Sequence, residues 1–356
     1  MVGDSLQMRN GSRTVHWGLV SEYRREIMGA ACILIMCCHS TFLWPDSSVA
    51  QVIKTAFSSG NVGVELFLLI SGVGLCYSYE KKSTLGRFYL NRYVRLLVPY
   101  LLLCVPYWAW RDLYVGKDNF LMDVFQLTFP LKGVITYWYI TASAGFYLVF
   151  PLVYNWINGQ FQFCKNATRE MRTTVLCLIA MIALFVMMYR HPTLYRHCEI
   201  GMTRIIVFMI GCYLGNHVKE KRPIADHWVL ISGMVCVSVP LLFKMVTMHD
   251  YWYRMLYVVF GLGLLIVLLW LLRCNWMRIF RRGLCFCGDR SIELYITHVS
   301  IRNVFETYDP QGWLDRETVI GYLVVIALSF AVSTLIHPVI KGISGILLKE
   351  RKSMKQ

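Results

Sequence analysis

Ten apolar runs, each about as long as a membrane-crossing helix, constrain this chain more than any other feature of its sequence. A helix that spans a bilayer needs roughly 20 predominantly apolar residues, and the connectors between these runs are short and charged. The sequence therefore predicts an all-α, polytopic membrane helix bundle with about ten transmembrane helices. The predicted spans are 27–44, 61–79, 93–110, 134–156, 173–189, 202–217, 228–246, 251–272, 283–303 and 319–340.

The composition excludes several other protein classes. Hydrophobic residues make up 56% of the 356 residues and charged residues 16%, whereas soluble domains average roughly 45–50% and about 25%. So apolar a chain is not intrinsically disordered. Most of the 13 Cys lie inside apolar runs and none forms a CxxC pair, which favours small buried side chains over disulfides. We also expect no metal site.

The basic residues predict how the chain is oriented. A net charge of +15 could indicate nucleic-acid binding in a soluble protein, but here the charges lie between apolar runs. We therefore expect contact with the lipid bilayer and its anionic headgroups, and no nucleic acid. If both termini are cytoplasmic, most of the 36 Lys and Arg lie on the cytoplasmic side, as the positive-inside rule requires. We predict a cytoplasmic tail (1–26), a transmembrane domain (27–348) and a second cytoplasmic tail (349–356).

Ionisable side chains inside predicted spans are costly in a bilayer and are therefore candidate functional residues. His39, Glu65 and His298 lie in three separate spans, at similar predicted depths in the outer half of the membrane. Two imidazoles and a carboxylate can form a general acid/base site. The alternative is a polar cluster that only orients the helices.

Arginines at both membrane faces are candidate anion-binding residues. Arg92 and Arg95 are three residues apart at the inner start of a span, which places both guanidinium groups on one helix face. They could clamp a phosphate group from the cytoplasm or simply anchor the span. Arg204, at the outer end of another span, could bind an anionic or sugar group or extend to the membrane surface.

Four sequence blocks occur in the order that they have in a known family. They are Arg25–Ser40, GNVGVELFLLISG at 60–72, the RxxR of Arg92 and Arg95, and CGDRSIELYITH at 287–298. In these blocks, and in RIIVFMIGCYLG at 204–215, the chain resembles the acyltransferase-3 family. These integral membrane acyltransferases are often O-acetyltransferases of cell-surface glycans. The resemblance implies a multi-pass protein of a bacterial cytoplasmic membrane.

The resemblance also implies roles for individual residues. The family has a histidine late in its first helix that acts in acyl transfer, and His39 matches it. The RxxR pair of the family is associated with the acyl-CoA donor on the cytoplasmic side. The family also has an S-x-x-x-Y-x-x-H element, which Ser291, Tyr295 and His298 match. Glu65 stands at a position that is usually acidic in the family.

The sequence departs from the family pattern at one position. The family typically has an arginine eleven residues before the histidine, and Met28 stands there. Arg24 and Arg25 lie about one turn earlier, so either could replace it, and we include Arg25 in the predicted donor site. Otherwise the donor contact is altered or the activity is reduced.

We therefore expect an enzyme that moves an acyl group, expected to be acetyl, from acyl-CoA to a hydroxyl of a cell-envelope glycan or lipid-linked sugar. His39 would accept the hydroxyl proton or carry the acyl group transiently. The predicted site residues are His39, Glu65 and His298 for catalysis, Arg25, Arg92 and Arg95 for the donor, and Arg204, Ser291 and Tyr295 for the substrate.

Two other functions remain open on sequence grounds. A transporter of a small metabolite or lipid-linked sugar would also use outer-half His and Glu residues, as a proton relay. Many transporters carry internal repeats, and we find none in this sequence. A non-catalytic, degenerate family member is the second alternative, which the departure at Met28 favours.

Overall fold

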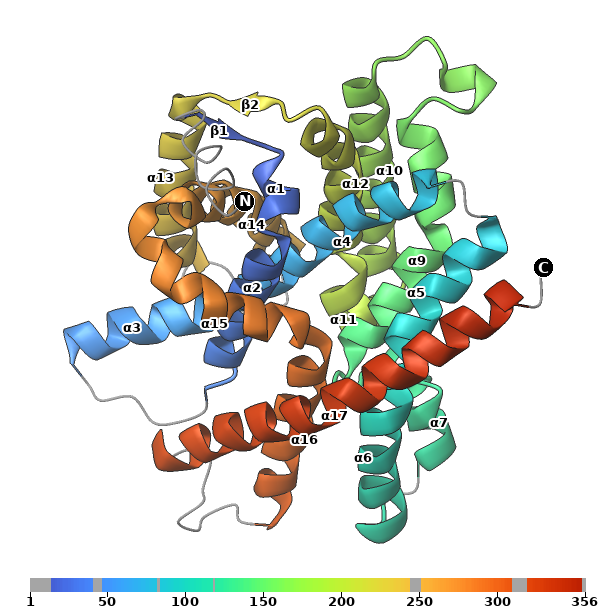
Figure 1. Cartoon of the computed structure of the whole chain (residues 1–356), viewed down its shortest axis with the longest axis vertical. Coiled ribbons are helices and arrows are strands. Elements are labelled where there is room, and N and C mark those ends of the chain that lie inside the picture. Colours follow the sequence, from blue (N-terminus) through green and yellow to red (C-terminus); the bar gives the residue numbers. More distant parts are fainter. Residues whose placement is uncertain are drawn as a thin grey trace, which may run out of the picture.

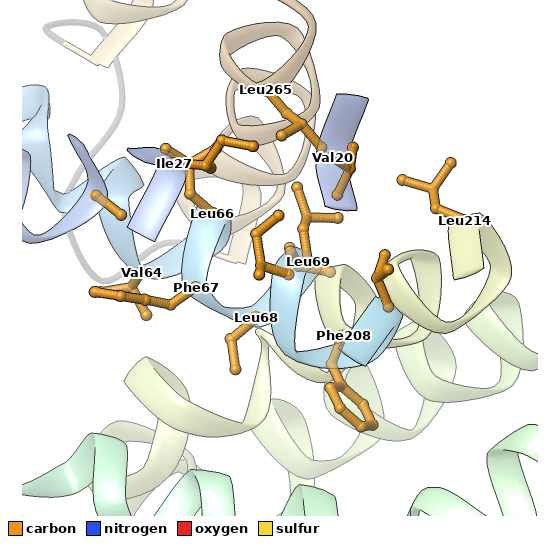
Figure 2. Close-up of a cluster of buried hydrophobic side chains, with 14 of the residues drawn as sticks. Val20, Ile27, Val64, Leu66, Phe67, Leu68, Leu69, Phe208, Leu214 and Leu265 are labelled. Atoms are coloured by element: carbon orange, nitrogen blue, oxygen red, sulfur yellow. The ribbon is translucent and has the colours of Figure 1, made fainter. Parts of the chain in front are cut away.

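The architecture is built around one buried helix, α4 (Gly63–Glu80). The computed structural model describes residues 14–40, 47–81, 84–117, 119–243, 251–308 and 319–353. Because α4 is apolar on nearly all sides, it is stable only when other helices cover it. Figure 2 shows its Leu66 and Leu69 among Ile27 of α2 (Arg24–Cys38), Phe208 of α12 (Ile205–Lys219) and Leu265 of α14 (Tyr251–Arg273).

Glycines allow the central helices to approach each other closely, as is common where helices pack in membranes. Where α4 crosses α12, a Cβ atom on Gly72 would lie 2.7 Å from the Cys212 backbone nitrogen. Where α2 crosses α15 (Arg278–Asp289), a Cβ atom on Gly29 would overlap the Leu284 carbonyl oxygen. A Cβ atom on Gly288 would likewise overlap the carbonyl oxygen of Arg25. These crossings therefore admit no larger residue without a shift of backbone.

Seven helical runs in the described part of the chain are long and apolar enough to cross a membrane, which confirms an all-α, polytopic bundle. The α13 helix (Asp226–Leu242) is apolar but shorter. The total of ten spans and the cytoplasmic termini stay predictions, and residues 41–44 and 244–246 of two predicted spans lie outside the described residues. The seven runs are Ser48–Glu80, Leu85–Tyr114, Trp138–Ile157, Arg169–Arg190, Pro192–Lys219, Tyr251–Arg273 and Val319–Leu348.

Several of these runs consist of more than one element. In Leu85–Tyr114, π-helical turns at Tyr100–Cys104 and Trp110–Tyr114 follow α5 and α6; Pro99 precedes the first, where a missing N–H interrupts the regular ladder. The segment between the predicted spans 93–110 and 134–156 contains two short helices, α7 (Phe120–Val124) and α8 (Thr128–Lys132). The remaining α-helices of the described residues are α1 (Leu19–Glu22), α3 (Ser48–Ser58), α5 (Leu85–Pro99), α6 (Val105–Ala109), α9 (Trp138–Ile157), α10 (Arg169–Arg190), α11 (Pro192–Met202), α16 (Ser291–Tyr308) and α17 (Val319–Ser353).

The N-terminal segment packs against the bundle from Val15 onward. The strand β1 (Val15–His16) pairs antiparallel with β2 (Pro223–Ile224), with Val15 opposite Ile224. Val15 and Val20 are buried. Residues 14–26 therefore contribute to the folded domain, although the sequence alone suggested a tail.

The predicted span 283–303 is not one continuous helix and needs correction. The structure divides it into α15 and α16, which meet at Arg290. The α15 sequence is rich in arginine and strongly amphipathic, with Ile279 and Phe280 exposed on one side. Such a helix suits the surface of a membrane better than its interior. In Figure 1, α17 lies across both α16 and α5.

The α2–α15 crossing predicts opposite effects for two glycine substitutions on one helix. Gly288→Ala should lower the free energy of unfolding by about 1–3 kcal/mol, because the new methyl group must displace the Arg25 backbone. Gly283→Ala is the matched control, since nothing lies within 4 Å of its Cβ position. Alanine should be neutral or stabilising there. Thermal unfolding in detergent measures both, and equal midpoints for the two variants would contradict this packing.

Candidate functional site

The two predicted catalytic histidines are in direct contact. His39 caps the C-terminus of α2, and His298 lies in α16. Nδ1 of His39 is 2.8 Å from Nε2 of His298, and the stacked rings have centroids 5.1 Å apart. Nδ1 of His298 is in turn 2.8 Å from the carbonyl oxygen of Leu294. The structure thus joins two residues that are 259 positions apart in the sequence.

This chain of hydrogen bonds determines which ring nitrogens carry protons. A carbonyl oxygen can only accept, so Nδ1 of His298 must donate to Leu294. In neutral His298 the other nitrogen, Nε2, is then an acceptor, and Nδ1 of His39 donates to it. Nε2 of a neutral His39 consequently keeps a free lone pair. A nitrogen in that state can act as a general base or as a nucleophile.

A small cavity of about 10 Å³ adjoins the pair, which we call the dyad cavity. Its lining includes His39, His298 and Arg302. Arg302 is not among the site residues predicted from the sequence. The available signal was its spacing, because a residue four positions after His298 lies on the same helix face.

Three arginines face another cavity at the predicted cytoplasmic end of α2. Arg24, Arg92 and Arg95 line this cavity, which has a volume of about 360 Å³. We call it the outer donor cavity, because it contains the predicted donor residues Arg92 and Arg95 and is the farther of two adjoining cavities from the histidines. Nη2 of Arg92 donates to the Gly74 carbonyl oxygen at 3.0 Å. Among the described residues, no carboxylate pairs with these three guanidinium groups. Desolvation, followed by repulsion from Arg95, lowers the pKa of Arg24. Such an excess of positive charge is suited to binding a polyanion.

An inner donor cavity of about 120 Å³ continues from the outer one toward the histidines. The two cavities share Arg24 and Arg92 in their linings. Ser291 and Tyr295, both predicted site residues, line the inner cavity. The Tyr295 ring also contacts the His298 ring, with a centroid distance of 6.0 Å. The adjoining cavities therefore lead from the arginines to the neighbourhood of the two histidines.

Of the two arginines that precede Met28, Arg24 is the one that lines these cavities. Met28 itself lines the inner donor cavity. Arg25 is paired with Asp289 of α15, with Nε donating to Oδ1 at 2.6 Å. The bond to Asp289 raises the pKa of Arg25. The predicted donor residue Arg25 therefore lies in a different environment from Arg92 and Arg95, whereas its neighbour Arg24 lies beside them.

The third predicted catalytic residue, Glu65, belongs to a separate buried ion pair. Its Oε1 is 2.7 Å from Nε of Arg204, and both side chains are buried. Nη2 of Arg204 also donates to Oδ1 of Asn61 at 3.2 Å, and its guanidinium carbon lies 4.8 Å from the Trp138 ring centroid. The structure thus brings Glu65 and Arg204 together, and it brings His39 and His298 together as a distinct pair.

Two further buried pairs did not emerge from the sequence. Nη2 of Arg254 is 3.0 Å from Oε1 of Glu199, and Nδ1 of His337 is 2.8 Å from Oε1 of Glu293. Each pair joins helices that are far apart in the chain. No spacing rule within a single helix could have indicated them.

Comparison with known proteins identifies the family. The acyltransferase-3 family profile, described as an acyltransferase domain, matches residues 29–337, which is most of the chain. The matched region contains His39, His298, Arg92 and Arg95. No curated protein and no solved structure gives a significant match. The sequence match and the membrane-spanning helices together show that this protein belongs to the acyltransferase-3 family and is a multi-pass membrane acyltransferase.

Proposed function

We propose that this protein transfers an acyl group, with acetyl as the expected group, from acyl-CoA to a hydroxyl of a cell-envelope glycan or lipid-linked sugar in a bacterial cytoplasmic membrane. The observation that carries the proposal is the contact between His39 and His298, which leaves Nε2 of a neutral His39 unprotonated near the end of a cavity path. That path begins at three arginines that have no carboxylate partner among the described residues. A basic nitrogen and a polyanion site are the two elements that CoA-dependent acyl transfer needs.

The donor would enter from the predicted cytoplasmic side. Arg24, Arg92 and Arg95 would bind the phosphates of CoA through charge-assisted hydrogen bonds. The extended thiol arm would follow the inner donor cavity past Ser291 and Tyr295. Its thioester would then lie beside His39, where the acceptor hydroxyl arrives from the opposite side of the membrane.

The reaction itself needs one proton acceptor. The acceptor hydroxyl gives its proton to Nε2 of His39 while its oxygen attacks the thioester carbonyl carbon. A C–O bond forms, the C–S bond breaks, and CoA leaves as a thiolate that takes the proton back from His39. His298 holds the reactive tautomer of His39, and the guanidinium of Arg302 can stabilise the negative charge that develops on the carbonyl oxygen.

Substitution of His39 tests this function directly. In membranes given labelled acetyl-CoA, His39→Ala should lower the transfer of label to envelope material by roughly 10²–10⁴-fold, because a positioned base contributes about that much. His227→Ala, at an exposed histidine on α13, is the control and should keep full activity. An active protein whose rate is unchanged in His39→Ala would refute the mechanism. Proton-driven flux of a sugar or metabolite without any CoA dependence would instead favour a transporter.

The two neighbouring arginines provide a matched test of the donor site. Arg24→Ala should raise the KM for acetyl-CoA by roughly 10–100-fold, since a hydrogen bond to a charged group contributes about 1.5–3 kcal/mol. Arg25→Ala removes the same charge one position along the chain and should change KM little, because Arg25 pairs with Asp289. If Arg25→Ala has the larger effect on KM, the donor does not occupy these cavities.

The Glu65–Arg204 pair predicts a structural role that can be separated from catalysis. Glu65→Ala should destabilise the fold by about 3–5 kcal/mol, because it leaves a buried guanidinium without its partner. The double variant Glu65→Leu with Arg204→Met removes both charges and should recover most of the thermal stability and the acyl transfer. A double variant that is stable but inactive would contradict a purely structural role and show that at least one of the two residues acts in catalysis or in substrate binding.

A further inference from the structure

The dyad cavity has walls of a distinctive kind. Besides the imidazoles of His39 and His298, its lining includes three apolar side chains, Met36 of α2 and Val325 and Ile326 of α17. Tyr322 and Arg302 complete the lining. The branched aliphatic side chains of Val325 and Ile326 therefore share a cavity with the reactive histidine.

Hydrogen bonds between three helices hold this cavity in shape. The Tyr322 hydroxyl donates to the Met36 carbonyl oxygen at 2.8 Å, which ties α17 to α2. Nδ1 of His337 lies 2.8 Å from Oε1 of Glu293, which ties α17 to α16, and the Thr297 hydroxyl lies 3.3 Å from the Ser329 carbonyl oxygen between the same helices. Val325 is only 4% exposed. Because three helices are joined around it, the cavity has little freedom to expand when a larger group enters.

The size of the cavity limits what it can hold. A volume of about 10 Å³ corresponds to roughly one water-sized sphere. A methyl group is of similar size, and the aliphatic walls suit it because they offer an apolar group dispersion contacts. A longer alkyl chain would have to displace Val325 or Ile326 from a closely packed interface, which is costly in protein interiors.

The position of the cavity fits the acyl end of the donor. Tyr295 lines the inner donor cavity and its ring contacts the ring of His298, with centroids 6.0 Å apart, and His298 lines the dyad cavity. A thioester carbonyl held beside His39 would thus have the thiol arm in one cavity and the remainder of its acyl group in the other.

We propose that the dyad cavity is the acyl pocket, and that Met36, Val325 and Ile326 restrict the donor to a two-carbon acyl group. This inference rests on the proposed acyl-CoA-dependent function. It adds the residues that decide acyl-chain length, which lie mainly on α17 and not among the residues that act on protons or phosphates.

Donor selectivity tests the proposal. The kcat/KM of the unaltered protein for acetyl-CoA should exceed that for butyryl-CoA by at least about tenfold, because each misfit methylene costs roughly 10–200-fold. Ile326→Ala should raise the ratio of butyryl to acetyl transfer by about tenfold or more. Leu323→Ala is the control, since Leu323 is 58% exposed on the same helix and lies outside the cavity. It should leave the ratio unchanged.

The possible outcomes separate this inference from the proposed function. Equal transfer of acetyl and butyryl groups by the unaltered protein would overturn the acyl pocket while the acyltransferase function stands. The milder Ile326→Val should move the ratio in the same direction if Ile326→Ala does not fold. A ratio that stays fixed in a folded, acetyl-transferring Ile326 variant would also overturn it. If no acyl-CoA is used by any variant, the proposed function itself fails.

Discussion

The close crossing of α2 and α15 is the contact on which the site depends. Gly29 and Gly288 let the two backbones approach to a distance that no side chain could occupy. Because α16 begins directly after Arg290, the direction of α15 also fixes where α16 lies against α2. That arrangement brings His39 and His298 to hydrogen-bonding distance. The contact between the two histidines thus depends on glycines that lack side chains, Gly29 and Gly288, each ten residues before one of the histidines.

Two sets of charges in the bundle differ in how they are neutralised. The pairs Glu65–Arg204, Glu199–Arg254 and Glu293–His337 satisfy one another between helices, as ionisable groups in a membrane interior must. By contrast, Arg24, Arg92 and Arg95 share a cavity without carboxylate partners in the described chain. Paired charges typically stabilise the packing of helices, whereas clustered charges of one sign imply a ligand that supplies the opposite charge.

The sequence predicted the class of fold and the parts of the site, but not how those parts are combined. Hydrophobic runs indicated a polytopic bundle, and the position of ionisable groups within or at the end of predicted spans singled out His39, Glu65, His298 and Arg204. Depth along a helix can be read from spacing, but the face that meets another helix is decided by long-range packing. Hence the pairing of Glu65 with Arg204, the contact between the histidines and the position of Arg24 beside Arg92 and Arg95 emerged only in three dimensions. The sequence did not indicate the break at Arg290, because the mean hydropathy over 283–303 combines the end of α15 with the beginning of α16.

One helix carries both ends of the proposed site. Arg24 lies at the first residue of α2 and His39 at its C-terminal cap, a separation of roughly 22 Å along a rigid rod. The length of α2 therefore fixes the distance between the arginine that would bind the donor and the histidine at which the donor would react. A donor with a shorter or longer thiol arm could bind equally well at Arg24, yet its thioester carbonyl carbon would not lie beside His39. Selection for arm length would then require no contact with the arm itself.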